Sequence, residues 1–282
     1  MSRPSVADKR RTFKELHRSG CFIIPNPWNV GTARRLQGLG FKALATTSSG
    51  FAHAEGFADG VVPCDTVLDH LREMAAATDV PLNADFEGGY ADAPDGVAAN
   101  VRRAIATGVA GLSIEDSTGD AKNPLYDFDL AVARVRAARA AIDAAGGDVV
   151  FTGRSEGFIC GRPDLDETLR RLKAYAEAGA DCLYAPGIKT REQIVAVVQA
   201  VAPKPVNFLM SSAMTNFTLS DLEALGVRRI STGGTLARVV WTAFMHSARE
   251  MAEQGRFDSF NGTISNPELN TFFRDDLPRW HA

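Results

Sequence analysis

Short apolar runs recur along the chain, and the segments between them carry apolar residues three and four positions apart. The runs predict eight short buried strands, at residues 21–25, 41–47, 80–85, 109–115, 148–153, 181–185, 205–210 and 227–231. The intervening segments, among them 65–78, 129–146, 164–179 and 190–201, have the periodicity of amphipathic helices and open with Asp or Thr, which are favoured N-cap residues. Strands and helices are therefore expected to alternate.

This alternation predicts the fold class. Many of the predicted helices end in glycine, which suits the left-handed residue after a helix, and a strand begins two or three residues later. Eight strand–helix units in one series favour a single α/β domain over 1–282, folded as a (β/α)8 barrel of the TIM type. The alternative is a doubly wound open sheet, against which counts the lack of a Gly-x-Gly-x-x-Gly motif after the first strand. Residues 1–19 would add an N-terminal helix, and 255–282 a C-terminal extension made of a loop and a short terminal element.

Composition narrows the classes of function. The 282 residues carry a formal net charge of −3 and no basic cluster, which argues against nucleic-acid binding. The four cysteines lie far apart without metal-ligand spacing, as expected of free thiols in a reducing compartment. No apolar segment reaches the length of a membrane span and no signal-peptide pattern is present, so we expect a cytoplasmic protein without a membrane partner.

Polar side chains gather where the predicted strands end, which in a barrel is the catalytic face. Asn83 and Asp85 point to the same side of the third strand, and Glu115 ends the fourth. Oxygen ligands of this kind suit a hard divalent cation, Mg2+ above all, with Mn2+ as the substitute. The alternative is that the carboxylates pair with Arg154 and with helix N-termini and bind no metal.

Arg154 ends the fifth strand and could hold a substrate carboxylate in a bidentate fork. Its alternative role is a structural salt bridge to Glu115 or Glu156. Tyr184 and Asn207 end the sixth and seventh strands and are further candidates for substrate binding. A carboxylate, metal and arginine site would suit the polarisation of a 2-oxo acid and the stabilisation of its enolate.

Four segments in this order, "SSGFAHAEGFADG", "NADFEGGY", "GLSIEDSTGD" and "FTGRSEGF", resemble the isocitrate lyase / phosphoenolpyruvate mutase superfamily over roughly residues 20 to 240. The resemblance implies a (β/α)8 barrel whose last helix is exchanged between subunits of a dimer or tetramer, and a 2-oxo acid bound with Mg2+. Carried over by position, the substrate would contact Ser49, Gly50 and Phe51, the metal would be surrounded by Asp59, Asp85 and Glu115, and Arg154 would clamp the substrate.

Two departures from the family pattern bear on the chemistry. Asn83 stands where the family usually has a metal-binding Asp, so the site loses one negative charge. The loop 116–129, "DSTGDAKNPLYDFD", has neither the Cys nor the His of the Lys-Cys-Gly-His-like motif that supplies the proton donor of the lyases. Proton transfer would then be left to Tyr126 or Lys122 of this loop, to Tyr184, or to water.

Three hypotheses follow from the sequence. The leading one is a Mg2+-dependent lyase that cleaves a C–C bond of a small 2-oxo or 2-hydroxy dicarboxylic acid, or decarboxylates it, through a metal-stabilised enolate. The second keeps the site and changes the reaction to P–C bond chemistry on phosphonopyruvate or phosphoenolpyruvate, as a mutase or hydrolase. The third is a catalytically weakened protein that binds a 2-oxo acid.

Overall fold

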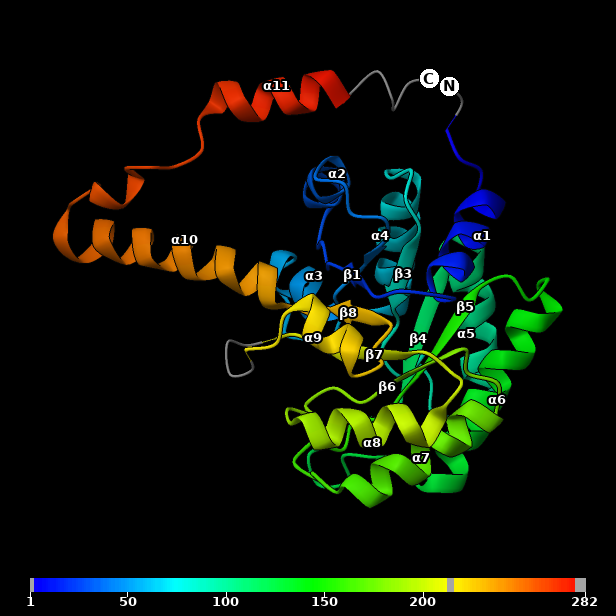
Figure 1. Cartoon of the computed structure of the whole chain (residues 1–282). Helices are drawn as coiled ribbons and strands as arrows, with labels where there is room; N and C mark the ends of the chain where they lie inside the picture. Colours follow the sequence, from blue (N-terminus) through cyan, green and yellow to red (C-terminus); the bar gives the residue numbers. More distant parts are fainter. Residues whose placement is uncertain (1–2, 212–215, 277–282) are drawn as a thin grey trace.

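The structure is a computed structural model that describes residues 3–211 and 216–276. Eight parallel strands form one sheet in the order β1-β8-β7-β6-β5-β4-β3-β2. The backbone N–H of Ala45 donates to the carbonyl of Pro25 at 3.1 Å and links the two ends of this order. The expected (β/α)8 barrel is confirmed (Figure 1). The strands are β1 (Phe22–Ile24), β2 (Leu44–Ala45), β3 (Leu82–Asp85), β4 (Gly111–Glu115), β5 (Val150–Arg154), β6 (Cys182–Tyr184), β7 (Val206–Leu209) and β8 (Arg229–Ser231).

Helices follow the strands and surround the barrel. They are α2 (Val30–Gly38), α3 (Ser48–Ala54), α4 (Cys64–Ala76), α5 (Pro94–Ala106), α6 (Phe128–Ala144), α7 (Leu165–Glu177), α8 (Arg191–Val201), α9 (Leu219–Ala224) and α10 (Thr235–Gln254). Within the described chain, none of the helices has both the length and the apolarity needed to span a membrane.

The predicted helix starts are only half right. Asp164 and Thr190 cap α7 and α8 and accept hydrogen bonds from Glu167 and Gln193, as expected. The N-caps of α4 and α6 are instead residues 63 and 127, so residues 65 and 129 lie in the first turn. A carboxylate is favoured in the first turn as well as at the cap, because both positions face the positive end of the helix dipole.

The N-terminal helix α1 (Val6–Leu16) closes one end of the barrel. Its Phe13 is fully buried in a cluster with Phe22 and Val150, which begin β1 and β5. A Cβ on Gly111 would lie only 2.5 Å from the Phe13 ring, so a glycine at this position leaves room for the Phe13 side chain. With the N-terminal ends of the strands filled in this way, the polar cavity lies at their C-terminal ends.

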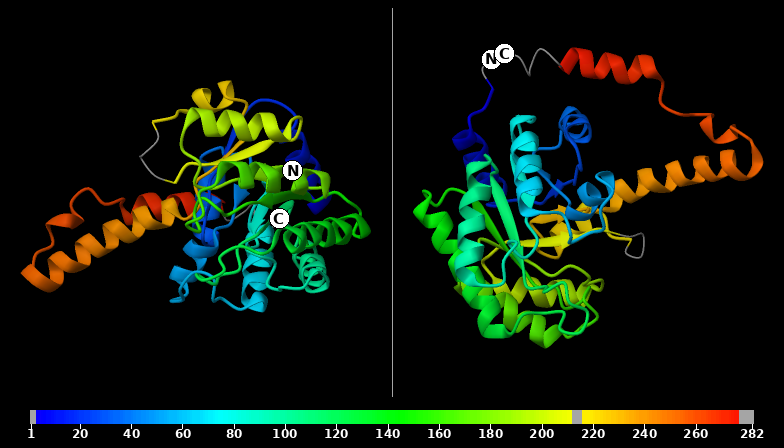
Figure 2. Two further views of the ribbon diagram at one scale, coloured as in Figure 1. Left: turned by 90° about the horizontal axis from the view of Figure 1, so that it is seen from below. Right: turned by 180° about the vertical axis from the view of Figure 1, so that it is seen from behind.

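The C-terminal extension is more structured than expected. It contains a short 3-10 helix, η1 (Asp258–Phe260), and a helix of 11 residues, α11 (Asn266–Asp276). Figures 1 and 2 show α10 projecting away from the barrel before the chain returns, and the ring of Phe272 in α11 lies 4.5 Å from the Arg35 guanidinium of α2. The projecting part of α10 exposes large apolar side chains, including Val239, Trp241 and Phe244.

Candidate active site

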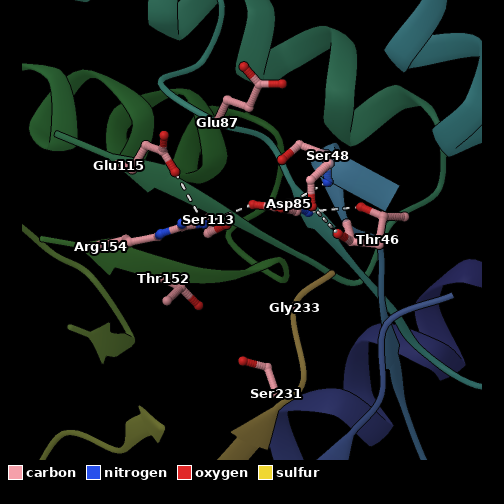
Figure 3. A network of polar contacts seen from close by, with 12 residues as sticks. Thr46, Ser48, Asp85, Glu87, Ser113, Glu115, Thr152, Arg154, Ser231 and Gly233 are labelled. Atoms are coloured by element: carbon pink, nitrogen blue, oxygen red, sulfur yellow. Dashed lines mark hydrogen bonds and ion pairs between the residues drawn. The ribbon is translucent and has the colours of Figure 1, made fainter. Parts of the chain in front are cut away.

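Three neighbouring strands bring acidic and basic side chains together at the barrel mouth. The register places Glu115 of β4 beside Arg154 of β5, and Asp85 ends β3 on the other side of β4. Nη1 of Arg154 lies 3.1 Å from an oxygen of Asp85 and 3.1 Å from an oxygen of Glu115. Its Nε contacts Glu156. Figure 3 shows Arg154 beside Asp85 and Glu115. One guanidinium is therefore shared by three carboxylates.

Asp85 is held from two sides. One carboxylate oxygen faces Arg154, and the other accepts the backbone N–H of Ser48, in the first turn of α3, at 3.0 Å. Its own N–H donates to the hydroxyl of Thr46 at 2.9 Å. Asp85 is thus partnered as the metal-free interpretation of the sequence expects, by Arg154 and a helix N-terminus.

The barrel mouth nevertheless holds more carboxylates than Arg154 can neutralise with its single positive charge. Burial raises the pKa values of Glu115 and Glu156 although Arg154 lowers them. Burial also raises the pKa of Glu87 to about 7, with Asp85 and Asp59 adding to the shift. Raised carboxylate pKa values indicate a site that would be stabilised by a further cation.

Arg154 takes the position from which it could exclude or replace such a cation. Burial opposes its charge, but Glu115, Glu156 and Asp85 raise its pKa well above the ordinary value. Over residues 3–211 and 216–276, no three Asp, Glu, His or Cys side chains converge closely enough to form a ready metal site. A metal at Asp85 and Glu115 would require these side chains to turn away from Arg154 or to bind it through water.

Glu156 is positioned from outside the barrel by Asp116, a buried residue that follows β4. One oxygen of Asp116 accepts the backbone N–H of Glu156 at 2.7 Å. The other accepts the Tyr175 hydroxyl at 2.6 Å and a guanidinium N–H of Arg171 at 3.2 Å. The loop after β5 is therefore tied to β4 and α7, which fixes the carboxylate that contacts Arg154.

Two adjoining cavities meet at this network. The inner one, about 150 Å³, reaches into the barrel, and the outer one, about 520 Å³, opens beneath the loop after β4. Both are lined by Ser48, Asp59 and Arg154. The inner volume equals that of about five water molecules in the liquid, which suits a small acid rather than a nucleotide.

Most of the predicted site residues line these cavities. The inner cavity is lined by Asn83, Asp85, Ser49, Tyr184 and Asn207, the outer one by Glu115 and Tyr126, and both by Asp59 and Arg154. The amide oxygen of Asn83 is buried and has no hydrogen-bond partner. The Tyr126 hydroxyl donates to Asp92. Their roles toward metal and substrate stay predictions.

Three predicted residues lie elsewhere. The Phe51 ring stacks on His70 at 3.8 Å in the core, and the N–H groups of Gly50 and Phe51 are both taken by Thr47. Both are therefore supports for the strand end rather than part of the cavity lining. Lys122 is exposed in the loop and lines neither cavity.

The residue that sequence reasoning missed is Arg229. It begins β8, is 3% exposed and lines the inner cavity from below. From its apolar run alone, residues 227–231 are an ordinary buried strand. Because side chains alternate along a strand, Arg229 and Ser231 share the inward face, and an arginine on that face is the signal that could have found it.

Comparison with known proteins gives a consistent set of similarities. The family model for phosphoenolpyruvate phosphomutase matches residues 13–252. A solved structure from Burkholderia cenocepacia J2315, described only as a lyase or mutase, is 44% identical, with a TM-score of 0.92 over 95% of this chain and 97% of that one. An oxaloacetate decarboxylase of Paraburkholderia xenovorans (strain LB400) is 30% identical over 261 residues, or 89% of this chain and 84% of the relative. An oxaloacetate acetylhydrolase solved with its product oxalate has the same fold, at 24% identity, a TM-score of 0.85 and 97% coverage of each chain.

Proposed function

The chain belongs to the phosphoenolpyruvate phosphomutase family and is an enzyme of the lyase type, and from this premise we propose its reaction. We propose a Mg2+-dependent lyase, able to use Mn2+, that cleaves a C–C bond of a small 2-oxo or 2-hydroxy dicarboxylic acid or decarboxylates it. The observation that carries the proposal is the group of carboxylates at the barrel mouth, of which Asp85, Glu115 and Glu156 share the single guanidinium of Arg154.

A divalent cation fits this excess of negative charge. Asp85, Asp59 and Glu115 would hold it, with Asn83 as a further oxygen donor whose amide oxygen is free of partners. When bound, the cation would act as a Lewis acid on the oxo group of the substrate. An amide can coordinate as well as a carboxylate does, but it contributes no charge, so we expect weaker binding than with an aspartate at this position.

The protein's own side chains would do the remaining work. Arg154 would exchange part of its contact with Asp85 and Glu115 for a substrate carboxylate, which it can clamp in a fork. In a decarboxylation the bond to the leaving carboxylate breaks, its electron pair stays on the neighbouring carbon as an enolate, and CO2 departs. A proton then adds to that carbon. Tyr126 at the outer cavity and Tyr184 at the inner one are the two candidate donors besides water.

The properties of Tyr184 bear on this choice. Burial raises its pKa to about 12, while Arg154 and a hydrogen bond from Ser231 lower it. A protonated phenol at neutral pH can donate, and Tyr184 lines the inner cavity, where the small acid would bind.

The size of the inner cavity supports a small substrate. The family likeness, together with the oxaloacetate decarboxylase relative, makes oxaloacetate the first compound to test. Purified protein with Mg2+ should be incubated with oxaloacetate, isocitrate, methylisocitrate and substituted malates, with products followed by proton NMR. Turnover of at least one of them, abolished by a chelator, is expected. Turnover of none would refute the lyase proposal.

The P–C bond alternative has one observation in its favour, the match to the phosphomutase family model itself. Incubation with phosphonopyruvate and phosphorus-31 NMR would detect it. Release of phosphate or formation of a phosphate ester, with no C–C cleavage, would replace the lyase proposal. Mg2+-dependent binding of oxalate without turnover of any compound would instead favour the 2-oxo acid binding protein.

We also propose that the chain forms a homo-oligomer through α10. Val240, Trp241, Phe244 and Met245 are each between 38% and 57% exposed on a helix that projects from the barrel. A contiguous apolar face of this kind marks an interaction surface, and a second copy that presents the same helix is its natural partner. Light scattering should show a dimer or tetramer, and Trp241→Glu should dissociate it. Leu130→Glu, on the exposed face of α6, is the control and should leave it intact.

A further inference from the structure

Arg229 is a buried guanidinium beneath the floor of the inner cavity. Its Nε donates to the amide oxygen of Asn207 at 2.8 Å, and Nη2 donates to the hydroxyl of Thr152 at 3.0 Å. Its Nη1 lies 3.3 Å from Nε2 of His17, which comes from the end of α1. These three contacts bring together β7, β5 and the segment that closes the barrel.

All three partners are uncharged. Nδ1 of His17 lies 2.7 Å from the carbonyl of Phe13 and must donate to it, because Arg229 offers only donors to Nε2. Burial, and then Arg229 itself, lowers the pKa of His17 to about 3, so this ring is neutral at physiological pH. The nearby Cys182 thiol is also neutral, because burial raises its pKa.

Within residues 3–211 and 216–276 no carboxylate forms an ion pair with Arg229, although Asp59 and Asp85 line the same cavity. Every other buried ion pair at the mouth involves Arg154 or Arg171, and Arg229 forms no salt bridge there. An arginine does not lose its proton in a protein, so this positive charge is permanent. A buried charge without a partner is costly, and its persistence beside a cavity indicates that something in the cavity compensates it.

The contacts of Arg229 also set the direction of hydrogen bonds at the cavity floor. Because Nε can only donate, the oxygen of Asn207 must face Arg229 and its NH2 group must face Ser231, to which it donates at 2.9 Å. Ser231 then accepts from Asn207 and has its own proton available. Ser231 lines the inner cavity, so that proton is directed toward Tyr184 or toward an anion bound there.

We propose that Arg229 is a positioning residue that makes the inner cavity selective for anions. Its uncompensated charge attracts an anionic group of the substrate, and through Asn207 it fixes the Ser231 hydroxyl as a hydrogen-bond donor into the cavity. This inference rests on the proposed function, since it takes the ligand to be a small acid. Arg229 itself need not touch the substrate.

The charge is tested with two substitutions at the same position. Arg229→Gln removes the charge but can still donate to Asn207, whereas Arg229→Lys keeps the charge. With oxalate as the probe and saturating Mg2+, calorimetry should show affinity reduced about tenfold in the Gln variant, the order expected for one unit charge in a partly buried site, and largely kept in the Lys variant. Unchanged affinity in a folded Gln variant would overturn the proposal, and so would equal losses in both variants.

The direction of the hydrogen bonds is tested by Asn207→Asp, which keeps the volume and gives Arg229 a counter-charge. Ser231 must then donate to the new carboxylate, so its proton no longer faces the cavity. We expect the melting temperature to stay the same or rise and oxalate affinity to fall at least tenfold. Wild-type oxalate affinity in this variant would contradict the proposal.

A readout independent of any substrate separates this inference from the proposed function. The pKa of His17, followed by NMR, should rise in Arg229→Gln by at least about one unit, because the nearby positive charge has gone. If wild-type protein binds no oxalate but His17 responds as expected, the proposed function fails while the uncompensated charge stands. If His17 does not respond, the inference itself is refuted.

Discussion

Replacing Arg154 with Gln would remove the one positive charge that three carboxylates share at the barrel mouth. Its Nη1 lies 3.1 Å from both Asp85 and Glu115, and its Nε contacts Glu156. Removing one partner of a buried ion pair typically costs about 3–5 kcal/mol, because the remaining charge loses its partner but stays buried. We expect Arg154→Gln to lower the free energy of unfolding by about 3 kcal/mol at neutral pH, the lower end of that range, since the carboxylates can take up protons.

The pH dependence follows from the raised pKa values of Glu115 and Glu156. A carboxylate with a raised pKa binds more protons in the folded than in the unfolded state, so its contribution to stability falls as pH rises through the folded value. Removal of Arg154 raises these pKa values further. The deficit of the variant relative to wild type should therefore grow as pH rises above 4.5, the ordinary pKa of a glutamate.

The same reasoning predicts an effect of Mg2+. A cation that takes over the role of counter-charge binds only the folded state and should stabilise Arg154→Gln more than wild type. Urea unfolding followed by circular dichroism, with and without Mg2+, measures both effects. Arg170→Gln is the matched control, because Arg170 contacts Glu167 at 2.7 Å but is 54% exposed, and its loss should reduce stability far less than the loss of Arg154. The reasoning is refuted if Arg154→Gln is as stable as wild type and Mg2+ stabilises both equally.

Three further changes test other parts of the account. Asp116→Asn should lower kcat about tenfold with little change in KM, and steady-state kinetics checks this. The amide NH2 must face either the Glu156 N–H or the Tyr175 and Arg171 donors, so Glu156 is held less firmly while the cavity keeps its lining. Burial lowers the pKa of His70 to about 4, so its contribution to stability is complete above about pH 6.5 and is lost as pH falls toward 4. In His70→Gln the free energy of unfolding should change less over this pH range, by on the order of 2 kcal/mol. An unaltered pH dependence would contradict the prediction. Tyr126→Phe should reduce turnover at least tenfold if the Tyr126 hydroxyl is the proton donor, whereas Lys122→Ala should leave turnover unchanged. Wild-type turnover in both variants would assign the proton transfer to Tyr184 or water.

Most of the strands could be predicted because two signals agree at them. Apolar runs mark the buried segments, and glycines such as Gly108 and Gly179, both with positive φ, mark the turns that lead into β4 and β6. The predicted runs are longer than the strands, since residues beyond the hydrogen-bonded ladder are still extended and buried. The helix α11 was not expected, because its stability comes from contacts with α2 that no local pattern reveals.

The site was predicted where it depends on topology and missed where it depends on packing. Parallel strands end at one face, so Asp85, Glu115 and Arg154 had to meet there once the barrel was assigned. For Arg154 the sequence left two roles open, a contact with the substrate carboxylate or a salt bridge to Glu115 or Glu156, and the structure contains the salt bridges. Phe51 follows Ser49 by two positions in a helix, so its side chain points away from the cavity into the core. Arg229 was missed because its signal, an arginine on the inward face, depends on first assigning which side chains of β8 point into the barrel.

The most direct test of the central claim is the Mg2+-dependent turnover of oxaloacetate by wild type and by Asp85→Asn. Asparagine has the same shape and can still accept the Ser48 N–H, but it removes one negative charge from the group of carboxylates. Pyruvate formation should be coupled to lactate dehydrogenase, with samples that contain Mg2+ but no protein correcting for the decay that Mg2+ alone promotes. The account predicts Mg2+-dependent turnover in wild type that falls by at least about a hundredfold in the variant. Equal rates in the two proteins, at every Mg2+ concentration, would contradict it.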